Sequence, residues 1–137
     1  MLFDLLQNTD VLEEACRLLD ALIFDVKCLD SERHKASTGV GNELILRNLH
    51  FVFEHFPDLP VLVRTPVIPG FNDTEEDILS IREMLPKRST VRYEALTYHR
   101  MGQPKYGYLG RPYPLEGVKA DEAFMTRLNA MLKAYQQ

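Results

Sequence analysis

The sequence predicts an α/β fold in which βα repeats build a parallel sheet. Two observations support this prediction. Short apolar runs alternate along the chain with segments of helical periodicity. Within these runs the apolar residues are largely continuous, as is typical of parallel strands that helices cover on both faces. Three such strands are too few for a finished sheet of this type, so the pattern fits part of a barrel or of a doubly wound fold.

The first two predicted elements are a helix and a strand. Apolar side chains recur on one face of residues 10–19, which predicts a helix. Residues 21–24 form a continuous apolar run that ends at Asp25, and we expect a strand buried on both faces there. A polar connection is expected to continue as far as Gly41.

The second repeat begins with a helix after Asn42, a suitable N-cap residue. Apolar residues then repeat at helical spacing until Pro57, which cannot continue a helix. The segment from Val61 to Val67 is apolar and largely β-branched, and it predicts the second buried strand.

The third repeat opens with Thr74 and Asp77, which are spaced as in a capping box. The helix that follows is expected to stop at Pro86. Residues 91–97 predict the third strand, because one set of alternate residues differs in character from the other. The first set is Val91, Tyr93, Ala95 and Thr97, and the second is Arg92, Glu94 and Leu96. A long loop rich in Gly, Pro and Tyr then precedes a last amphipathic helix. The apolar residues that define this helix are Phe124, Leu128, Met131, Leu132 and Tyr135.

Composition excludes several classes of protein. Residues 1–137 are enough for a single domain with a core. The net charge is −4 and no basic stripe is present, so we expect no nucleic-acid binding. No apolar stretch is long enough to cross a membrane. The two cysteines predict neither a disulfide framework nor a metal site, and a reducing cytoplasm is the expected location.

Ionisable side chains occur at or near the end of each predicted strand. Asp25 and Lys27 stand at the exit of the first strand, Arg64 lies inside the second, and His99 follows the third. Ligands of parallel α/β folds bind at the carboxyl ends of the strands, so these residues are candidates for a ligand site. Structural alternatives remain open. Asp25 could form an ion pair with Lys27 or with Arg64, and a single histidine is more often structural than functional.

Four motifs then occur in order, and together they resemble the glycyl radical enzyme activating enzymes of the pyruvate formate-lyase activase type. The motifs are D-x-K-x-x-D-x-x-x-H-x-x-x-T-G-x-x-N from Asp25 to Asn42, R-x-P-V-I-P-G-x-N-D from Arg64 to Asp73, Y-H-x-x-G-x-x-K-Y from Tyr98 to Tyr106, and L-G-x-x-Y from Leu109 to Tyr113.

The resemblance implies the C-terminal part of an open (β/α)6 barrel of the radical SAM type. Such an oxidoreductase uses a [4Fe-4S] cluster to cleave S-adenosylmethionine, and the resulting 5′-deoxyadenosyl radical takes a hydrogen atom from a glycine of a partner enzyme. The implied partner is a pyruvate formate-lyase-like glycyl radical enzyme, whose glycine loop would dock near Lys105 and Tyr106. A monovalent cation is implied near Asp25. The implied S-adenosylmethionine site consists of Asp25, Val26, Lys27, Arg64 and His99.

The sequence departs from this family in one large respect. The family holds its cluster through a C-x-x-x-C-x-x-C motif, and a cluster of this kind needs several thiolates. This chain has two cysteines, Cys16 and Cys28, and no two of its glycines are adjacent as in the family's Gly-Gly-Glu-Pro segment. We therefore expect a chain that lacks the N-terminal, cluster-binding portion, contains no catalytic or metal-ligating residue of its own, and is inactive alone. The alternatives are a non-catalytic ligand-binding or assembly module, or an α/β domain whose motif match is misleading.

Overall fold

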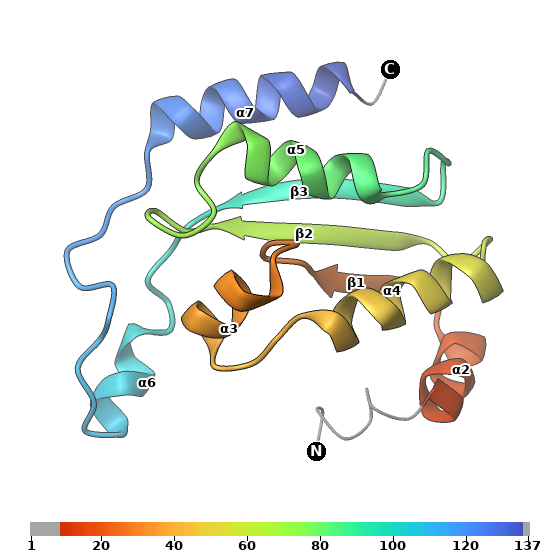
Figure 1. Ribbon diagram of the computed structural model, residues 1–137, viewed down its shortest axis with the longest axis horizontal. Coiled ribbons are helices and arrows are strands. Elements are labelled where there is room, and N and C mark those ends of the chain that lie inside the picture. The colour runs from red at the N-terminus through yellow and green to blue at the C-terminus, as the bar shows by residue number, and fades with distance from the viewer. Residues whose placement is uncertain (1–8, 136–137) are drawn as a thin grey trace.

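The computed structural model describes residues 9–135, which form three βα repeats between a first and a last helix (Figure 1). The predicted alternation of helices and strands is confirmed. The elements are α2 (Thr9–Leu18), β1 (Leu22–Asp25), α3 (Ser31–Thr38), α4 (Glu43–His55), β2 (Val61–Val67), α5 (Glu75–Met84), β3 (Val91–Thr97), α6 (Gln103–Tyr108) and α7 (Glu122–Ala134).

The three strands form one parallel sheet in the order β1-β2-β3. Its register places Asp25 opposite Arg64, and Arg64 opposite Glu94. All three strands end on the same side of the molecule, toward α6 and the loop that follows it (Figure 1). The three strand exits therefore meet along one edge, with Asp25 at the last residue of β1 and Arg64 inside β2.

Helices cover one face of this sheet and leave the other largely open. Alternate residues of β2 are buried, including Val61, Val63 and Thr65, and they belong to the face that packs against the helices. A single apolar core joins this face to α2, α4, α5 and α7. On the opposite face Ile23 is 56% exposed, and Asp25 and Glu94 are also exposed. The prediction that the first strand is buried on both faces is therefore wrong for this chain.

Two short helices were not predicted. The connection between β1 and α4 contains α3, which begins after Asp30 and ends at Gly39. The loop after β3 contains α6. Neither has an apolar stripe of the kind that identified the longer helices. Among the described residues, no helix is both long and apolar enough to cross a membrane.

Candidate functional site

Asp25 and Arg64 form an ion pair on the open face of the sheet. They are register partners on β1 and β2, and the Arg64 Nε and Nη2 atoms each lie 3.1 Å from Asp25 Oδ1. The side chains are 44% and 34% exposed. Because water screens such a pair, it contributes little to stability. The structural alternative for Arg64 is thus realised in this structure, on a surface that a ligand could also reach.

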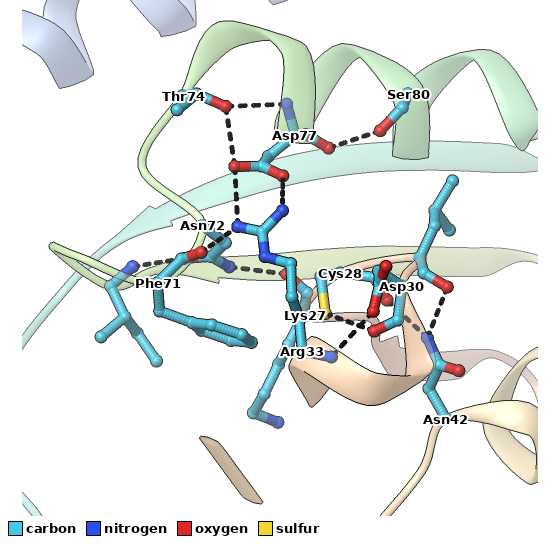
Figure 2. A network of polar contacts seen from close by, with 12 residues as sticks. Lys27, Cys28, Asp30, Arg33, Asn42, Phe71, Asn72, Thr74, Asp77 and Ser80 are labelled. Carbon is cyan, nitrogen blue, oxygen red and sulfur yellow. Dashed lines mark hydrogen bonds and ion pairs between the residues drawn. The ribbon is translucent and has the colours of Figure 1, made fainter. Parts of the chain in front are cut away.

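Directly after β1, residues 26–30 have no strand or helix structure, and each of their carbonyl oxygens accepts a hydrogen bond. Figure 2 shows Asn42 and Asn72 beside this segment. Thr65 Oγ1 donates to the Val26 carbonyl at 2.6 Å, and Asn72 Nδ2 donates to that of Lys27 at 2.7 Å. Asn42 Nδ2 donates to the next two carbonyls, at 2.8 and 3.0 Å. The carbonyl of Asp30 accepts from the backbone N–H of His34 at 3.0 Å. We name residues 26–30 the exit segment.

These side-chain donors are themselves buried. Asn42 and Asn72 are 2% and 0% exposed, and Thr65 is fully buried. Asn72 is also bonded to the β2 exit, since it donates to the Pro66 carbonyl at 3.0 Å and accepts from the Ile68 N–H at 2.7 Å. Buried polar groups with satisfied hydrogen bonds define a single local geometry. The backbone that carries Lys27 is therefore held in one position.

A chain of hydroxyl groups crosses the sheet beneath the exit segment. Tyr93 on β3 donates to Thr65 Oγ1 at 2.9 Å, and Thr65 in turn donates to the Val26 carbonyl on the neighbouring chain segment. Burial is the main reason that the pKa of Tyr93 rises to about 12, so its phenol keeps the proton near neutral pH. The Val26 N–H donates to the Arg64 carbonyl at 2.9 Å, so Val26 is bound to β2 through both of its backbone groups.

A clamp ties α3 to α5 on the outer side of the exit segment (Figure 2). Arg33 Nη1 lies 2.7 Å from Asp77 Oδ1, and Arg33 Nη2 donates to the Phe71 carbonyl. Asp77 also accepts from Thr74 Oγ1 at 2.7 Å. The hydrogen bond from Arg33 is the main cause that lowers the pKa of Asp77 below its usual range. The clamp fixes the helix that follows the exit segment.

Lys27 and His99 line a common cleft of 580 Å³ at the carboxyl edge of the sheet. Its volume falls within the range of small-molecule sites. Three tyrosines form part of the wall: Tyr98 and Tyr113 share a hydrogen bond of 2.6 Å between their hydroxyls, and the ring of Tyr106 packs edge-on against Tyr113 at 5.1 Å. Burial of its hydroxyl and the bond to Tyr113 raise the pKa of Tyr98 to about 12.

The structure thus separates the predicted site residues into two places. Lys27 and His99 line the cleft, whereas Asp25 and Arg64 pair on the open sheet face and do not line it. Val26 connects the two places through its backbone. The cation that the resemblance implies near Asp25 stays a prediction.

Sequence reasoning missed the asparagines and Thr65. Asn42 does stand at the N-cap position of α4, but its side chain bonds the exit segment and makes no cap hydrogen bond. Both asparagines occur in quoted motifs, which was the available signal. Within residues 9–135, no group of three or more His, Cys, Asp or Glu side chains could hold a metal ion, and both cysteines are free and buried.

Fold and site together define a class: a parallel α/β domain that holds a cationic cleft at the carboxyl edge of its sheet. Comparison with known proteins identifies the relatives. No family model matches the chain. It is 78% identical over 129 residues to the (2S)-3-sulfopropanediol sulfolyase activating enzyme of Bilophila wadsworthia, a match that covers 94% of this chain and 43% of that protein.

A second curated protein and a solved structure are also activating enzymes. The isethionate sulfite-lyase activating enzyme of Oleidesulfovibrio alaskensis is 46% identical over 90% of this chain and 40% of its own length. The crystal structure of a domain of a pyruvate-formate lyase-activating enzyme from Bacteroides vulgatus superimposes with a TM-score of 0.67 at 27% identity, over 93% of this chain and 70% of that one.

The chain is therefore homologous to part of the glycyl radical enzyme activating enzymes, and the resemblance read from its motifs is confirmed. A misleading motif match is excluded by these identities. The chain spans 40–43% of the length of the two curated relatives named here.

Proposed function

We propose that this chain forms the C-terminal portion of an open (β/α)6 barrel in a radical SAM activase, where it supplies one wall of the S-adenosylmethionine site. The observation that carries the proposal is the exit segment, which holds the backbone of Lys27 at a cleft that His99 also lines, at the carboxyl edge of the sheet. The motif match and the 78% identity to an activating enzyme support it.

The charges of the wall fit the groups of S-adenosylmethionine that need partners. Lys27 and Arg64 offer cations for a carboxylate, and Asp25 offers an anion for an amine or a bound monovalent cation. His99 offers a ring nitrogen for the nucleoside end, and the tyrosine wall of the cleft offers apolar surface. When cleaved by a reduced cluster, the cofactor supplies the radical that abstracts a hydrogen atom from glycine. The residues of this chain bind and orient it.

The described residues do not fit a [4Fe-4S] cluster. Cys16 and Cys28 are the only cysteines of the sequence, both are buried, and burial raises the pKa of each thiol, which disfavours the thiolate that binds iron. Under this proposal the ligands of the cluster belong to another portion of the barrel, and this chain alone is inactive.

We infer that the partner is a glycyl radical enzyme of the sulfolyase kind. This refines the expected pyruvate formate-lyase-like partner, because the relative at 78% identity is named for a sulfolyase. The loop around α6, which contains Lys105 and Tyr106, adjoins the cleft and is the proposed docking place of the glycine loop. A cytoplasmic location also stays a prediction.

The experiment replaces the matching segment of the Bilophila wadsworthia relative by residues 9–135 of this chain. After reconstitution with iron and sulfide under reduction, we expect 5′-deoxyadenosine from the chimera and none from the isolated chain. Lys27→Met in the chimera should lower its formation about tenfold or more at limiting S-adenosylmethionine, since a charged hydrogen bond is lost. Lys35→Met, an exposed change on α3, is the control. Turnover by the isolated chain, or equal loss in both variants, would contradict the proposal.

A second candidate is a non-catalytic assembly module. It is favoured by β1, which lies at the edge of the sheet, and by the exposed side chains of Leu18 (80%) and Ile23 (56%) nearby. An open strand edge next to apolar surface favours pairing with another strand. Light scattering of the isolated chain tests this candidate, and a monodisperse monomer would count against it.

A further inference from the structure

A second cavity lies at the opposite end of the sheet from the cleft. It has a volume of 480 Å³, and its lining comes from the end of α5, the loop that follows it, the start of β3 and Tyr135 after α7. The end of α5 and the start of β3 lie away from α6 (Figure 1). We name this second cavity the basic groove. Its polar lining consists chiefly of Arg82, Lys87, Arg88, Arg92, Ser89 and Tyr135.

Within the described residues, the four cations of the basic groove have no carboxylate beside them. No carboxylate lines the groove, and none of these four side chains forms an ion pair within residues 9–135. Like charges in one cavity repel each other, and the repulsion is stronger near a protein surface than in bulk water. An anion bound in the groove would remove this repulsion, so the cavity has a preference for negative ligands.

Arg88 is held in place before any ligand arrives. Its Nη2 atom donates to the Phe53 carbonyl at 2.9 Å, and its guanidinium lies 5.5 Å from the centroid of the Phe53 ring. A positioned guanidinium loses less conformational entropy on binding than a free one. The groove therefore has one fixed cation, with Lys87 and Arg92 exposed on its rim.

The dipole of α5 explains the position of only one of the four cations of the basic groove. Arg82 is in the last turn of α5, where a cation interacts favourably with the helix dipole. Lys87 and Arg88 follow the end of that helix, and Arg92 comes from β3. The dipole effect does not extend beyond the last turn, so it does not explain why side chains from three segments face one cavity.

We propose that the basic groove binds a phosphoryl ligand, a compact and multiply charged oxyanion such as a diphosphate group. The guanidinium groups of the arginines can donate paired hydrogen bonds to the oxygens of such a group, and the lysine adds a further charged donor. The Ser89 hydroxyl adds a neutral donor. A cavity of 480 Å³ accommodates a diphosphate together with part of the molecule that bears it. The site is independent of the cleft that holds Lys27 and His99, because the two cavities share no lining residue.

The test titrates the full chain with inorganic pyrophosphate at low salt, followed by calorimetry and by amide NMR shifts. We expect one saturable site with a dissociation constant of about 1 mM or tighter, and shifts concentrated in residues 82–93. Affinity should fall as salt is raised, since the rim charges are exposed. Absence of saturable binding, or shifts centred on another region, would overturn the proposal.

Paired variants separate a specific site from general charge. Lys87→Gln with Arg92→Gln should weaken pyrophosphate binding about tenfold, because two rim cations are lost. Arg47→Gln with Arg111→Gln removes the same charge from exposed positions outside the groove and should change binding less than twofold. Equal weakening by both pairs would overturn the proposal. So would a hexa-aspartate peptide that binds as tightly as pyrophosphate, because the groove would then select acidic chains over phosphoryl groups.

Discussion

Thr65 is the residue on which the position of the exit segment depends most directly. Its hydroxyl accepts from Tyr93 and donates to the Val26 carbonyl, so one side chain links β2 and β3 to the exit segment next to Lys27. The residue is fully buried, and each of its polar contacts replaces a contact with water. A change here should therefore disturb the site more than a change at the end of the hydroxyl chain.

We predict that Thr65→Val destabilises the chain more than Tyr93→Phe does. Tyr93→Phe removes one neutral hydrogen bond, at a cost of about 1 kcal/mol. Thr65→Val preserves shape but removes the donor of the Val26 carbonyl and the acceptor of the Tyr93 hydroxyl, at a cost of about 2–3 kcal/mol. Urea unfolding followed by circular dichroism measures both. Equal free energies of unfolding for the two variants would show that Val26 does not depend on this hydroxyl.

At the scale of elements, the clamp between α3 and α5 determines how the chain leaves the sheet. Arg33 bonds Asp77 and the Phe71 carbonyl, so it joins the helix after β1 to the loop after β2. The pKa of Asp77 is lowered chiefly by its hydrogen bond from Arg33. A carboxylate with a lowered pKa in the folded state stabilises it above its unfolded pKa, near 4, and loses that contribution as pH falls through the folded pKa.

The clamp should therefore produce an acid-dependent stability that Arg33→Gln reduces, while the hydrogen bonds between Thr74 and Asp77 remain. Above about pH 5 this variant should lose about 1 kcal/mol, a value reduced for the exposure of Arg33. As the pH falls below about 4, the native chain should lose the contribution of the Arg33–Asp77 ion pair, so the difference between the two free energies of unfolding should shrink. Urea unfolding at a series of pH values measures this. Arg47→Gln, on the exposed side of α4, serves as control; parallel curves for Arg33→Gln and the native chain would refute the clamp.

Elements with an apolar stripe could be predicted from the sequence, and those without one could not. The helices α4, α5 and α7 and the three strands follow from periodicity and from Pro57 and Pro86. The helix α3 lacks apolar periodicity, and its signals were the Asp30 N-cap, which accepts from the Arg33 N–H, and Gly39, whose φ of 87° is left-handed. Exposure of the second sheet face could not be predicted, because an apolar strand does not state how many of its faces are covered.

The sequence also predicted only part of the candidate site. Topology and motifs brought Lys27 and His99 to one edge of the sheet, and the structure places both in one cleft. The pairing of Asp25 with Arg64 was one of two open alternatives and depends on strand register. The roles of Asn42 and Asn72 depend on carbonyl groups that become neighbours only in the fold. No local pattern encodes those contacts.

At the scale of the whole molecule, the sheet is covered unequally on its two faces. The helices cover one face of the sheet, while the opposite face presents Asp25 and Arg64, and β1 lies at a sheet edge. The relatives are more than twice as long as the matched segment. These features agree with the proposed wall of an open barrel that receives S-adenosylmethionine between this chain and further strands.

The most direct test of the activase proposal is electron paramagnetic resonance of the partner enzyme. The chimera that carries residues 9–135 in the Bilophila wadsworthia relative is incubated with the sulfolyase, S-adenosylmethionine and a reductant. We predict a glycyl radical signal from the chimera, and a signal reduced about tenfold when the chimera carries Lys27→Met, with Lys35→Met unaffected. A folded chimera that produces 5′-deoxyadenosine but no glycyl radical would contradict the proposed partner. A full signal with Lys27→Met would contradict the proposed cofactor wall.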